Sequence, residues 1–316
     1  MLTIRNLSKT YPNGTQALKG ITLDIPRGMF GLLGPNGAGK STLMRTLATL
    51  QDADQGDARL DAPAGAIDVL RDHAAVRRTL GYLPQDFGVY PKVSAIDMLD
   101  HFARLKGFSA RAERKALVES LLKQVNLWDV RKKALGGFSG GMRQRFGIAQ
   151  ALIGNPQLVI VDEPTAGLDP EERVRFHNLL AEIGENVVVI LSTHIVQDVS
   201  DLCGRMAVIN KGELLLEGAP LELLGLVKGS VWRKTVARAD VETEKQQHAV
   251  ISTRLVSGQT VIHVFSRTPP GAGFEPADVT LEDVYFAAIY GHLRVGALAG
   301  AADVHASGNG AAGVAQ

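Results

Sequence analysis

Residues 31–47 read GLLGPNGAGKSTLMRTL: a short apolar run, a glycine-rich loop and a segment whose apolar residues have helical spacing. The loop from Gly34 to Ser41 matches the pattern G-x-x-x-x-G-K-[ST] at every fixed position. A strand, such a loop and a helix in this order are typical of a phosphate site, because glycines let backbone N–H groups close around an anion. The stretch therefore predicts nucleotide binding within an α/β fold.

Each residue of the loop has an expected contact. Lys40 is expected to reach the β- and γ-phosphate oxygens, and the Ser41 hydroxyl to join the ligands of a Mg²⁺ ion. Thr42 is expected to contact the α-phosphate. The backbone of the remaining positions surrounds the β-phosphate, and these are Gly34, Pro35, Asn36, Gly37, Ala38 and Gly39.

Two consecutive carboxylates follow a second apolar run, LVIVDE at 158–163. Asp162 is expected to hold Mg²⁺ through water, and Glu163 to take a proton from an attacking water, a role that contributes about 10²–10⁴ in rate. The alternative is a solvated strand end. The four apolar residues before Asp162 favour burial instead.

Strands and helices alternate over the first two thirds of the chain. Helical spacing continues from the phosphate loop and dominates 87–155, with amphipathic segments at 95–107 and 111–127. Strands are expected at 2–11, 17–26, 28–34, 157–163, 186–194 and 205–215. This order favours a mostly parallel sheet covered on both faces and interrupted by a helical insertion.

The pattern changes near Leu224. Residues 230–241 and 249–268 are typical of strands, with a turn at Ser257-Gly258, and a closing helix is expected to be capped by Thr280. We therefore expect a small α+β accessory domain at 226–293. Residues 294–316 are mostly Ala, Gly and small polar residues, and they are expected to be disordered.

A second glycine-rich loop, GGFSGGMRQRFGIAQAL from Gly136, also leads into a predicted helix. A helix N-terminus favours anions, but this loop has no lysine. Arg143 and Arg145 are expected on a solvated helix face rather than in contact with nucleotide.

Six motifs in this order resemble those of the nucleotide-binding subunits of ABC transporters. They are the Lys40 loop, Gln85 in YLPQD, FSGGM at 138–142, LVIVDEP at 158–164, GLDP at 167–170 and His194 in STH. The resemblance covers about 1–225, an ABC-type ATPase domain with its helical subdomain at about 87–155. It implies a P-loop NTPase core with an antiparallel N-terminal β subdomain, and ATP and Mg²⁺ as ligands.

The resemblance also implies roles outside the phosphate loop. Tyr11 stacks on adenine, Gln85 senses Mg²⁺ and couples to the membrane partner, and His194 contacts the γ-phosphate. From the residues alone, Tyr11 has the alternative of ordinary packing, and His194 that of a hydrogen-bonded surface residue.

Members of this family work as head-to-tail pairs, with each ATP between the phosphate loop of one subunit and the signature loop of the other. This implies that Ser139, Gly140 and Gly141 serve the partner's nucleotide, which explains the missing lysine. Asp169 is expected at the subunit interface near the opposite phosphate loop. It can also cap the helix that starts at Pro170, and both can hold together.

The closing LEDVY at 281–285 resembles the C-terminal extension of exporter subunits that pair with ABC-2-type membrane proteins, and SGGMRQR resembles exporter-type members. The signature departs from the family pattern at Phe138, in place of leucine, and at Met142, in place of glutamine. Both changes keep the serine and the glycines.

Charge and composition restrict the partners. Lys+Arg 34 against Asp+Glu 33 gives a net charge of +1, so no overall attraction to nucleic acid or anionic lipid is expected. The single cysteine, Cys203, fits a reducing compartment, and no apolar run approaches a membrane span. We expect a peripheral protein on the cytoplasmic side of the cell membrane, without direct insertion. It would be held there by a membrane-spanning permease that grips Phe87, Tyr90 and Pro91, and paired with an identical or paralogous ATPase subunit.

The leading hypothesis is an ATP-hydrolysing subunit of a membrane exporter. A non-transport relative that remodels nucleic acid or ribosomes is the alternative, although such relatives usually carry two ATPase units or a long coiled-coil insertion. A self-contained P-loop kinase would leave FSGGM without a role.

Overall fold

The computed structural model describes residues 1–63, 65–85, 87–165 and 168–293. These residues divide into two compact units. The first comprises Met1–Gly204 with Ile209–Glu213, and the second comprises Arg205–Val208 with the described residues from Leu214 onward. The expected domain boundary at 225 stays a prediction, and the expected disordered tail at 294–316 lies outside the described residues.

Parallel strands organise the first unit, within a sheet of strand order β10-β9-β3-β8-β7-β6 whose first two strands contain residues of both units. β3 pairs with β8, β8 with β7 and β7 with β6, all in parallel. The strands are β3 (Gly28–Leu33), β6 (Leu80–Leu83), β7 (Leu158–Asp162), β8 (Val188–Thr193), β9 (Arg205–Asn210) and β10 (Glu213–Gly218). β7 and β8 are buried along their whole length, as expected of parallel strands covered on both faces.

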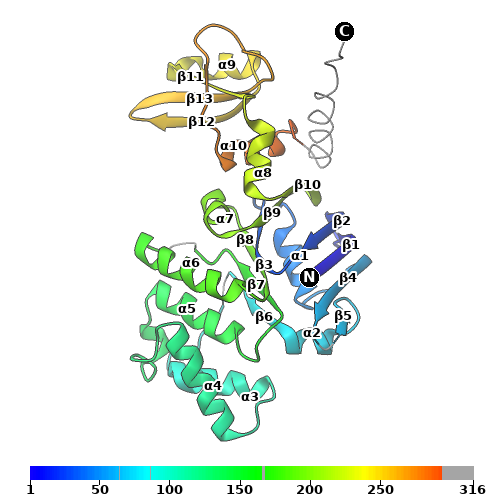
Figure 1. The fold of residues 1–316 in the computed structure, drawn as a ribbon, viewed down its shortest axis with the longest axis vertical. Helices are drawn as coiled ribbons and strands as arrows, with labels where there is room; N and C mark the ends of the chain where they lie inside the picture. Colours follow the sequence, from blue (N-terminus) through cyan, green and yellow to red (C-terminus); the bar gives the residue numbers. More distant parts are fainter. Residues whose placement is uncertain (64, 86, 166–167, 294–316) are drawn as a thin grey trace, which may run out of the picture. The chain divides into compact units, whose positions relative to one another are not determined.

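Helices cover this sheet, and a helical insertion extends from it (Figure 1). The helices outside the insertion are α1 (Lys40–Leu47), α2 (His73–Thr79), α6 (Pro170–Gly184) and α7 (Val196–Leu202). The insertion consists of α3 (Ala95–Leu105), α4 (Arg111–Gln124), the 3-10 turn η1 (Leu135–Gly137) and α5 (Gly140–Ala151). Phe30, Phe146 and Phe176 are fully buried, so β3, α5 and α6 all contribute to the core.

An antiparallel sheet of order β2-β1-β4-β5 completes the first unit. Its strands are β1 (Leu2–Thr10), β2 (Gln16–Ile25), β4 (Gln55–Ala62) and β5 (Gly65–Asp68). The pattern predicted β1 and β2 but not β4, where Ala58 and Leu60 are the two buried side chains of eight residues. With this sheet and the helical insertion, the predicted P-loop NTPase-type α/β fold is confirmed.

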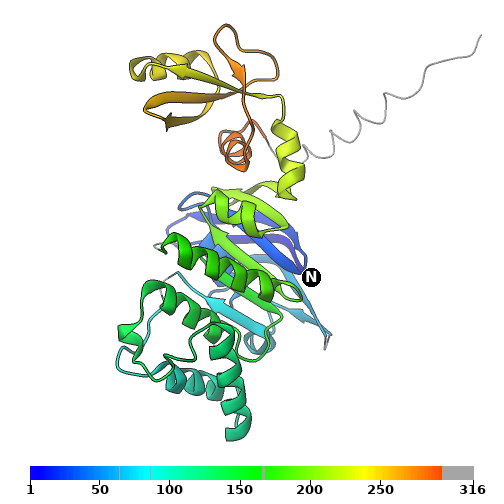
Figure 2. The same ribbon diagram turned by 60° about the vertical axis from the view of Figure 1, so that its left-hand side comes forward.

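The second unit contains a four-stranded antiparallel sheet of order β12-β13-β11-β14 and three helices among the described residues. The elements are α8 (Pro220–Val227), β11 (Val231–Val236), η2 (Arg238–Asp240), α9 (Val241–Gln247), β12 (Val250–Val256), β13 (Gln259–Phe265), β14 (Glu275–Pro276) and α10 (Leu281–Ile289). Figure 2 shows α9 and α10 on opposite faces of this sheet. The predicted turn is confirmed: Ser257 and Gly258 both have positive φ, as the tightest hairpin connections require.

A buried carboxylate attaches α10 to this sheet. Asp283 is fully buried, lies 2.7 Å from Nδ1 of His263 on β13, and accepts hydrogen bonds from the backbone N–H and hydroxyl of Thr280. Burial by itself raises the pKa of the Asp283 carboxyl, but the His263 and Thr280 contacts outweigh it and lower the pKa below its ordinary value. The ionised carboxylate therefore stabilises the fold at neutral pH.

We predict that Asp283→Ala lowers the free energy of unfolding of the second unit by about 2–4 kcal/mol, because buried donors lose their acceptor and α10 loses its cap. The measurement is Trp232 fluorescence during urea unfolding in a Trp128→Phe background, where Trp232 is the sole tryptophan. The neighbouring Glu282→Ala, which removes an exposed pair with Arg254, is the control and should cost less than about 1 kcal/mol.

The effect of Asp283→Ala should also depend on pH. A carboxyl with a lowered folded-state pKa stabilises the fold above its unfolded pKa of about 3.9 and loses that contribution as pH falls through the folded-state value. The stability difference between parent and variant should therefore be largest near neutral pH and shrink below about pH 4. A difference that grows on acidification would contradict this role.

Candidate functional site

A cavity of about 790 Å³ lies at the glycine-rich loop, a size that suits a nucleotide. It is lined by residues far apart in the sequence, among them Tyr11, residues 35–42 of the loop and α1, Gln85, Glu163 and His194. The parallel order β3-β8-β7 explains this convergence, because the loop after β3, the end of β7 and the turn after β8 all meet at the carboxyl edge of one sheet.

Glycines shape the loop by necessity. Gly37 and Gly39 have φ of +79° and +109°, a region that other residues rarely adopt. A Cβ atom on Gly39 would also lie 2.5 Å from the carbonyl oxygen of Ala17, and one on Gly34 would lie 2.3 Å from that of Ile209. The loop can therefore follow this path only with glycine at these positions, and it delivers the free N–H groups of α1 to the cavity.

Lys40 is only 6% exposed, at the first position of α1. Its ammonium donates to the carbonyl oxygen of Gly34 at 2.6 Å and lies 3.8 Å from Oε1 of Glu163. Burial lowers the pKa of Lys40, while the charges of Glu163 and Asp162 oppose that shift. Anionic phosphate oxygens would bind the Lys40 ammonium in place of the loop carbonyl.

Asp162 has the character of a cation ligand. It is buried at the end of β7, and its Oδ1 atom has no hydrogen-bond partner among the described residues. Burial raises the pKa of its carboxyl; the Ser192 hydroxyl acts against this, the negative Glu163 adds to it, and Lys40 and Ser41 again oppose it.

These residues fit Mg²⁺, which prefers oxygen ligands and keeps part of its water shell. Asp162 and Ser41 would hold the ion, and the expected contact of Gln85 with it stays a prediction. Its charge would offset the negative charge of the phosphates.

Both the backbone and the side chain of Glu163 are held by specific contacts. It has a left-handed backbone with φ of +48°, and its N–H donates to the carbonyl oxygen of Ser192 on β8. Such strain is retained where the surroundings impose it, commonly at functional sites. Its Oε2 lies 2.6 Å from Nδ1 of His194, whose side chain is 54% exposed. A buried carboxylate that can receive a proton therefore faces the cavity beside a solvent-accessible imidazole.

Tyr11, Thr42 and Gln85 also line the cavity. The Tyr11 hydroxyl lies 3.1 Å from the Thr42 hydroxyl and 3.2 Å from Oε1 of Gln51, so the ring is attached to α1. Stacking on adenine and sensing of Mg²⁺ stay predictions. Sequence reasoning missed Lys211, a further lining cation that belongs to no motif.

The second glycine-rich loop does not line this cavity. Ser139 caps α5, since its hydroxyl accepts a hydrogen bond from the N–H of Met142, and both Ser139 and Gly140 are exposed. Gly141 has a packing role, because a Cβ there would lie 2.3 Å from the carboxylate of Glu172 on α6.

Asp169 is also absent from the residues that line the cavity. Its side chain accepts a hydrogen bond from the N–H of Glu172 at 2.8 Å and so caps α6. This is the alternative that the sequence left open for Asp169, and its interface role stays a prediction.

The expectation that Arg145 is solvated was wrong. Its side chain is buried and its guanidinium lies 3.4 Å from Oε2 of Glu172, whereas Arg143 is exposed as expected. The reason is that α5 contacts both α6 and β6, which leaves little of the helix surface to solvent.

Known proteins are similar in sequence to most of this chain, beyond the short motifs. Residues 18–166 match the family described as ABC transporter. The daunorubicin/doxorubicin resistance ATP-binding protein DrrA of Streptomyces peucetius is 35% identical over 84% of this chain and 77% of its own length. ABC transporter A family member 10 of Arabidopsis thaliana is 32% identical over 90% of this chain, which spans 31% of that protein.

A solved dimeric ATP-binding cassette, in a post-hydrolysis state with ADP and Pi, matches with a TM-score of 0.61 and 27% identity over 69% of this chain and 98% of that one. Among the described residues, no helix is both long and apolar enough to span a membrane.

The family match, the DrrA relative and the cavity lined by a phosphate loop lead to one assignment. The chain belongs to the ABC transporter family, as an ATP-binding cassette with ATPase activity.

Proposed function

We propose that this chain powers an exporter-type membrane transporter by ATP-driven pairing of two cassettes, either identical or closely paralogous. Each ATP lies between the phosphate loop of one cassette and Ser139–Gly141 of the other. One observation carries this proposal: the chain has two glycine-rich loops that each lead into a helix, and of these two loops only the first contributes described residues to the cavity lining.

Gly140 supports the pairing. A Cβ atom at this position would meet no described atom within 4 Å, and the residue is exposed with no positive φ. The fold of the single chain therefore does not require glycine here. A glycine that allows close approach of a phosphate from outside the chain accounts for it.

Within one pocket the residues divide the work of hydrolysis. Lys40 and the loop N–H groups hold the phosphates, and Glu163 accepts a proton as water attacks the γ-phosphorus and the bond to the bridging oxygen breaks. His194 would contact the γ-phosphate through Nε2, because its Nδ1 faces Glu163. ADP and inorganic phosphate are the products, and their release removes the charge that links the cassettes.

The transport role rests on the relatives and on an exposed surface. DrrA is named for drug resistance, and the closing LEDVY resembles exporter subunits. Tyr90 is 66% exposed and the adjacent Pro91 is also exposed, so both are available to a cytoplasmic helix of a permease. Phe87 is half-buried and packs beside Gly147 of α5, so it would contribute less contact area to a permease than Tyr90 and Pro91.

The permease would place the cassette peripherally on the cytoplasmic face of the membrane. Co-purification with a protein of several membrane spans is expected. Co-purification with RNA or DNA instead would favour a non-transport role.

We predict that Glu163→Gln keeps ATP binding but abolishes turnover, because an amide cannot accept the proton, and that it traps a Mg-ATP-dependent dimer. Size-exclusion chromatography with light scattering, with and without Mg-ATP, measures this. Glu163→Gln combined with Lys40→Ala is the control and should remain monomeric. A Glu163→Gln chain that is monomeric with saturating Mg-ATP would contradict the pairing.

We predict that Ser139→Ala lowers the ATPase rate by about 10- to 100-fold, the cost of one hydrogen bond to a charged group, while the ATP affinity of the monomer changes less than about twofold. Steady-state kinetics and nucleotide titration at low protein concentration separate the two effects. Ser94→Ala removes an equivalent helix cap on α3 and should leave the rate unchanged. Equal losses of rate and monomer affinity would show that Ser139 serves the nucleotide of its own chain.

A further inference from the structure

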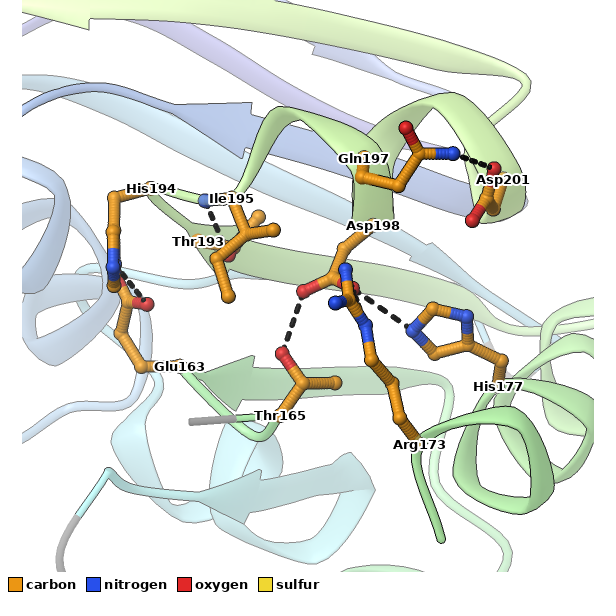
Figure 3. Close-up of polar contacts among 10 residues, drawn as sticks. All are labelled: Glu163, Thr165, Arg173, His177, Thr193, His194, Ile195, Gln197, Asp198 and Asp201. Atoms are coloured by element: carbon orange, nitrogen blue, oxygen red, sulfur yellow. Dashed lines mark hydrogen bonds and ion pairs between the residues drawn. The ribbon is translucent and has the colours of Figure 1, made fainter. Parts of the chain in front are cut away.

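Asp198 is a fully buried carboxylate on α7 that does not line the nucleotide cavity. Figure 3 shows side chains from two other segments converging on it. Oδ2 accepts a hydrogen bond from the Thr165 hydroxyl at 2.5 Å. Oδ1 accepts one from Nε of Arg173 at 2.8 Å and lies 3.0 Å from Nε2 of His177. These donors replace water around a charge that would otherwise be costly to bury.

The donors belong to the segments that flank the catalytic strand end. Thr165 follows Glu163 by two residues on the loop after β7. Arg173 and His177 lie one turn apart on α6 and so share one face of that helix. The N–H of Arg173 also donates to the carbonyl oxygen of Asp169, the cap of α6. One carboxylate thus contacts both Thr165, two residues after Glu163, and the first turns of α6, which Asp169 caps.

α7 itself begins directly after the turn that carries His194. The N–H of Ile195 donates to the Thr193 hydroxyl at 2.9 Å, which fixes this turn to the end of β8. The contact between Glu163 and His194 therefore joins the same two segments that the Thr165–Asp198 hydrogen bond joins at a second place (Figure 3). Asp198 forms its hydrogen bonds and ion pairs with Thr165, Arg173 and His177 and not with Glu163 or His194, so it can act only through the position of those two residues.

We infer that Asp198 is a positioning residue: its carboxylate fixes the positions of Glu163, through Thr165, and of the α6 N-terminus at Asp169 relative to the turn that carries His194. The inference rests on the proposed function, in which Glu163 and His194 act on one ATP while Asp169 meets the second cassette. Loss of the carboxylate should disturb hydrolysis and pairing together, and it should leave the phosphate loop around Lys40 intact.

The charge of Asp198 matters as well as its size. Burial by itself raises the pKa of the carboxyl, but the contacts from His177, Thr165 and Arg173 outweigh burial and lower the pKa below its ordinary value. The group is therefore ionised at neutral pH and accepts from every donor. An amide of the same volume would place an N–H₂ group against one of them.

The test is Asp198→Asn in the full chain. We expect kcat to fall by about 10- to 100-fold, the scale of a misplaced catalytic group, with less than about a twofold change in the ATP affinity of the monomer. Asp198→Asn added to Glu163→Gln should weaken the Mg-ATP-dependent dimer. Asp201→Asn is the matched control, because Asp201 lies on the same helix, is exposed and pairs with Gln197. It should leave both readouts unchanged.

Thr165→Val gives a second test if Asp198→Asn folds poorly, since it removes one hydroxyl without changing the charge. It should lower kcat in the same direction with ATP affinity retained. Unchanged kcat and dimerisation in these variants, with a Glu163→Gln parent that does form a dimer, would overturn this inference alone. A parent that forms no dimer would overturn the proposed function and this inference with it.

Discussion

Three charged side chains buried at the carboxyl edge of one parallel sheet constrain the rest of this molecule. Lys40, Asp162 and Glu163 lose their water, which is tolerable only where opposite charges and polar atoms face one another. The Lys40 ammonium lies 3.8 Å from Glu163 and donates to a loop carbonyl, while Oδ1 of Asp162 has no hydrogen-bond partner among the described residues. β3 and β7 both pair with β8, so the fold brings these charges together and leaves part of their bonding capacity for phosphate and metal.

The packing of α5 keeps the second glycine-rich loop, which contains Ser139 and Gly140, away from the nucleotide cavity. α5 is held against α6 and β6 by its buried face, including Gly141 and Arg145, so its capped N-terminus with Ser139 and Gly140 is left exposed. A single chain thus offers one loop that holds phosphates with a lysine, and another that offers N–H groups and a hydroxyl without one. Asp198 adds a link between the catalytic strand end and the helix capped by Asp169, which lies outside the cavity lining. In the proposed mechanism, this link would couple chemistry in one pocket to contact with a second cassette.

Local patterns predicted the parts of this fold that depend on local sequence. Continuous apolar runs identified β3, β7 and β8, and fixed motif spacing identified Lys40, Asp162 and Glu163 as one site. β4 was missed because its residues are mostly polar and it is stabilised by pairing with β1. Arg145 was misplaced since its burial depends on α6, and the Asp198 cluster escaped notice because its members come from separate segments with no shared spacing. Sequence periodicity carries no information about such long-range contacts.

The central claim is that each ATP pocket needs two chains, and complementation between two disabled variants tests it most directly. Lys40→Ala removes the phosphate-loop half, and Gly140→Asp blocks the signature half with a negative charge at a position where the fold has room for a side chain. Each variant alone should be nearly inactive. Their mixture should regain ATPase activity, because a mixed dimer contains one pocket in which both halves are intact. A mixture that forms mixed dimers, shown by cross-linking, yet stays as inactive as its components would contradict the account.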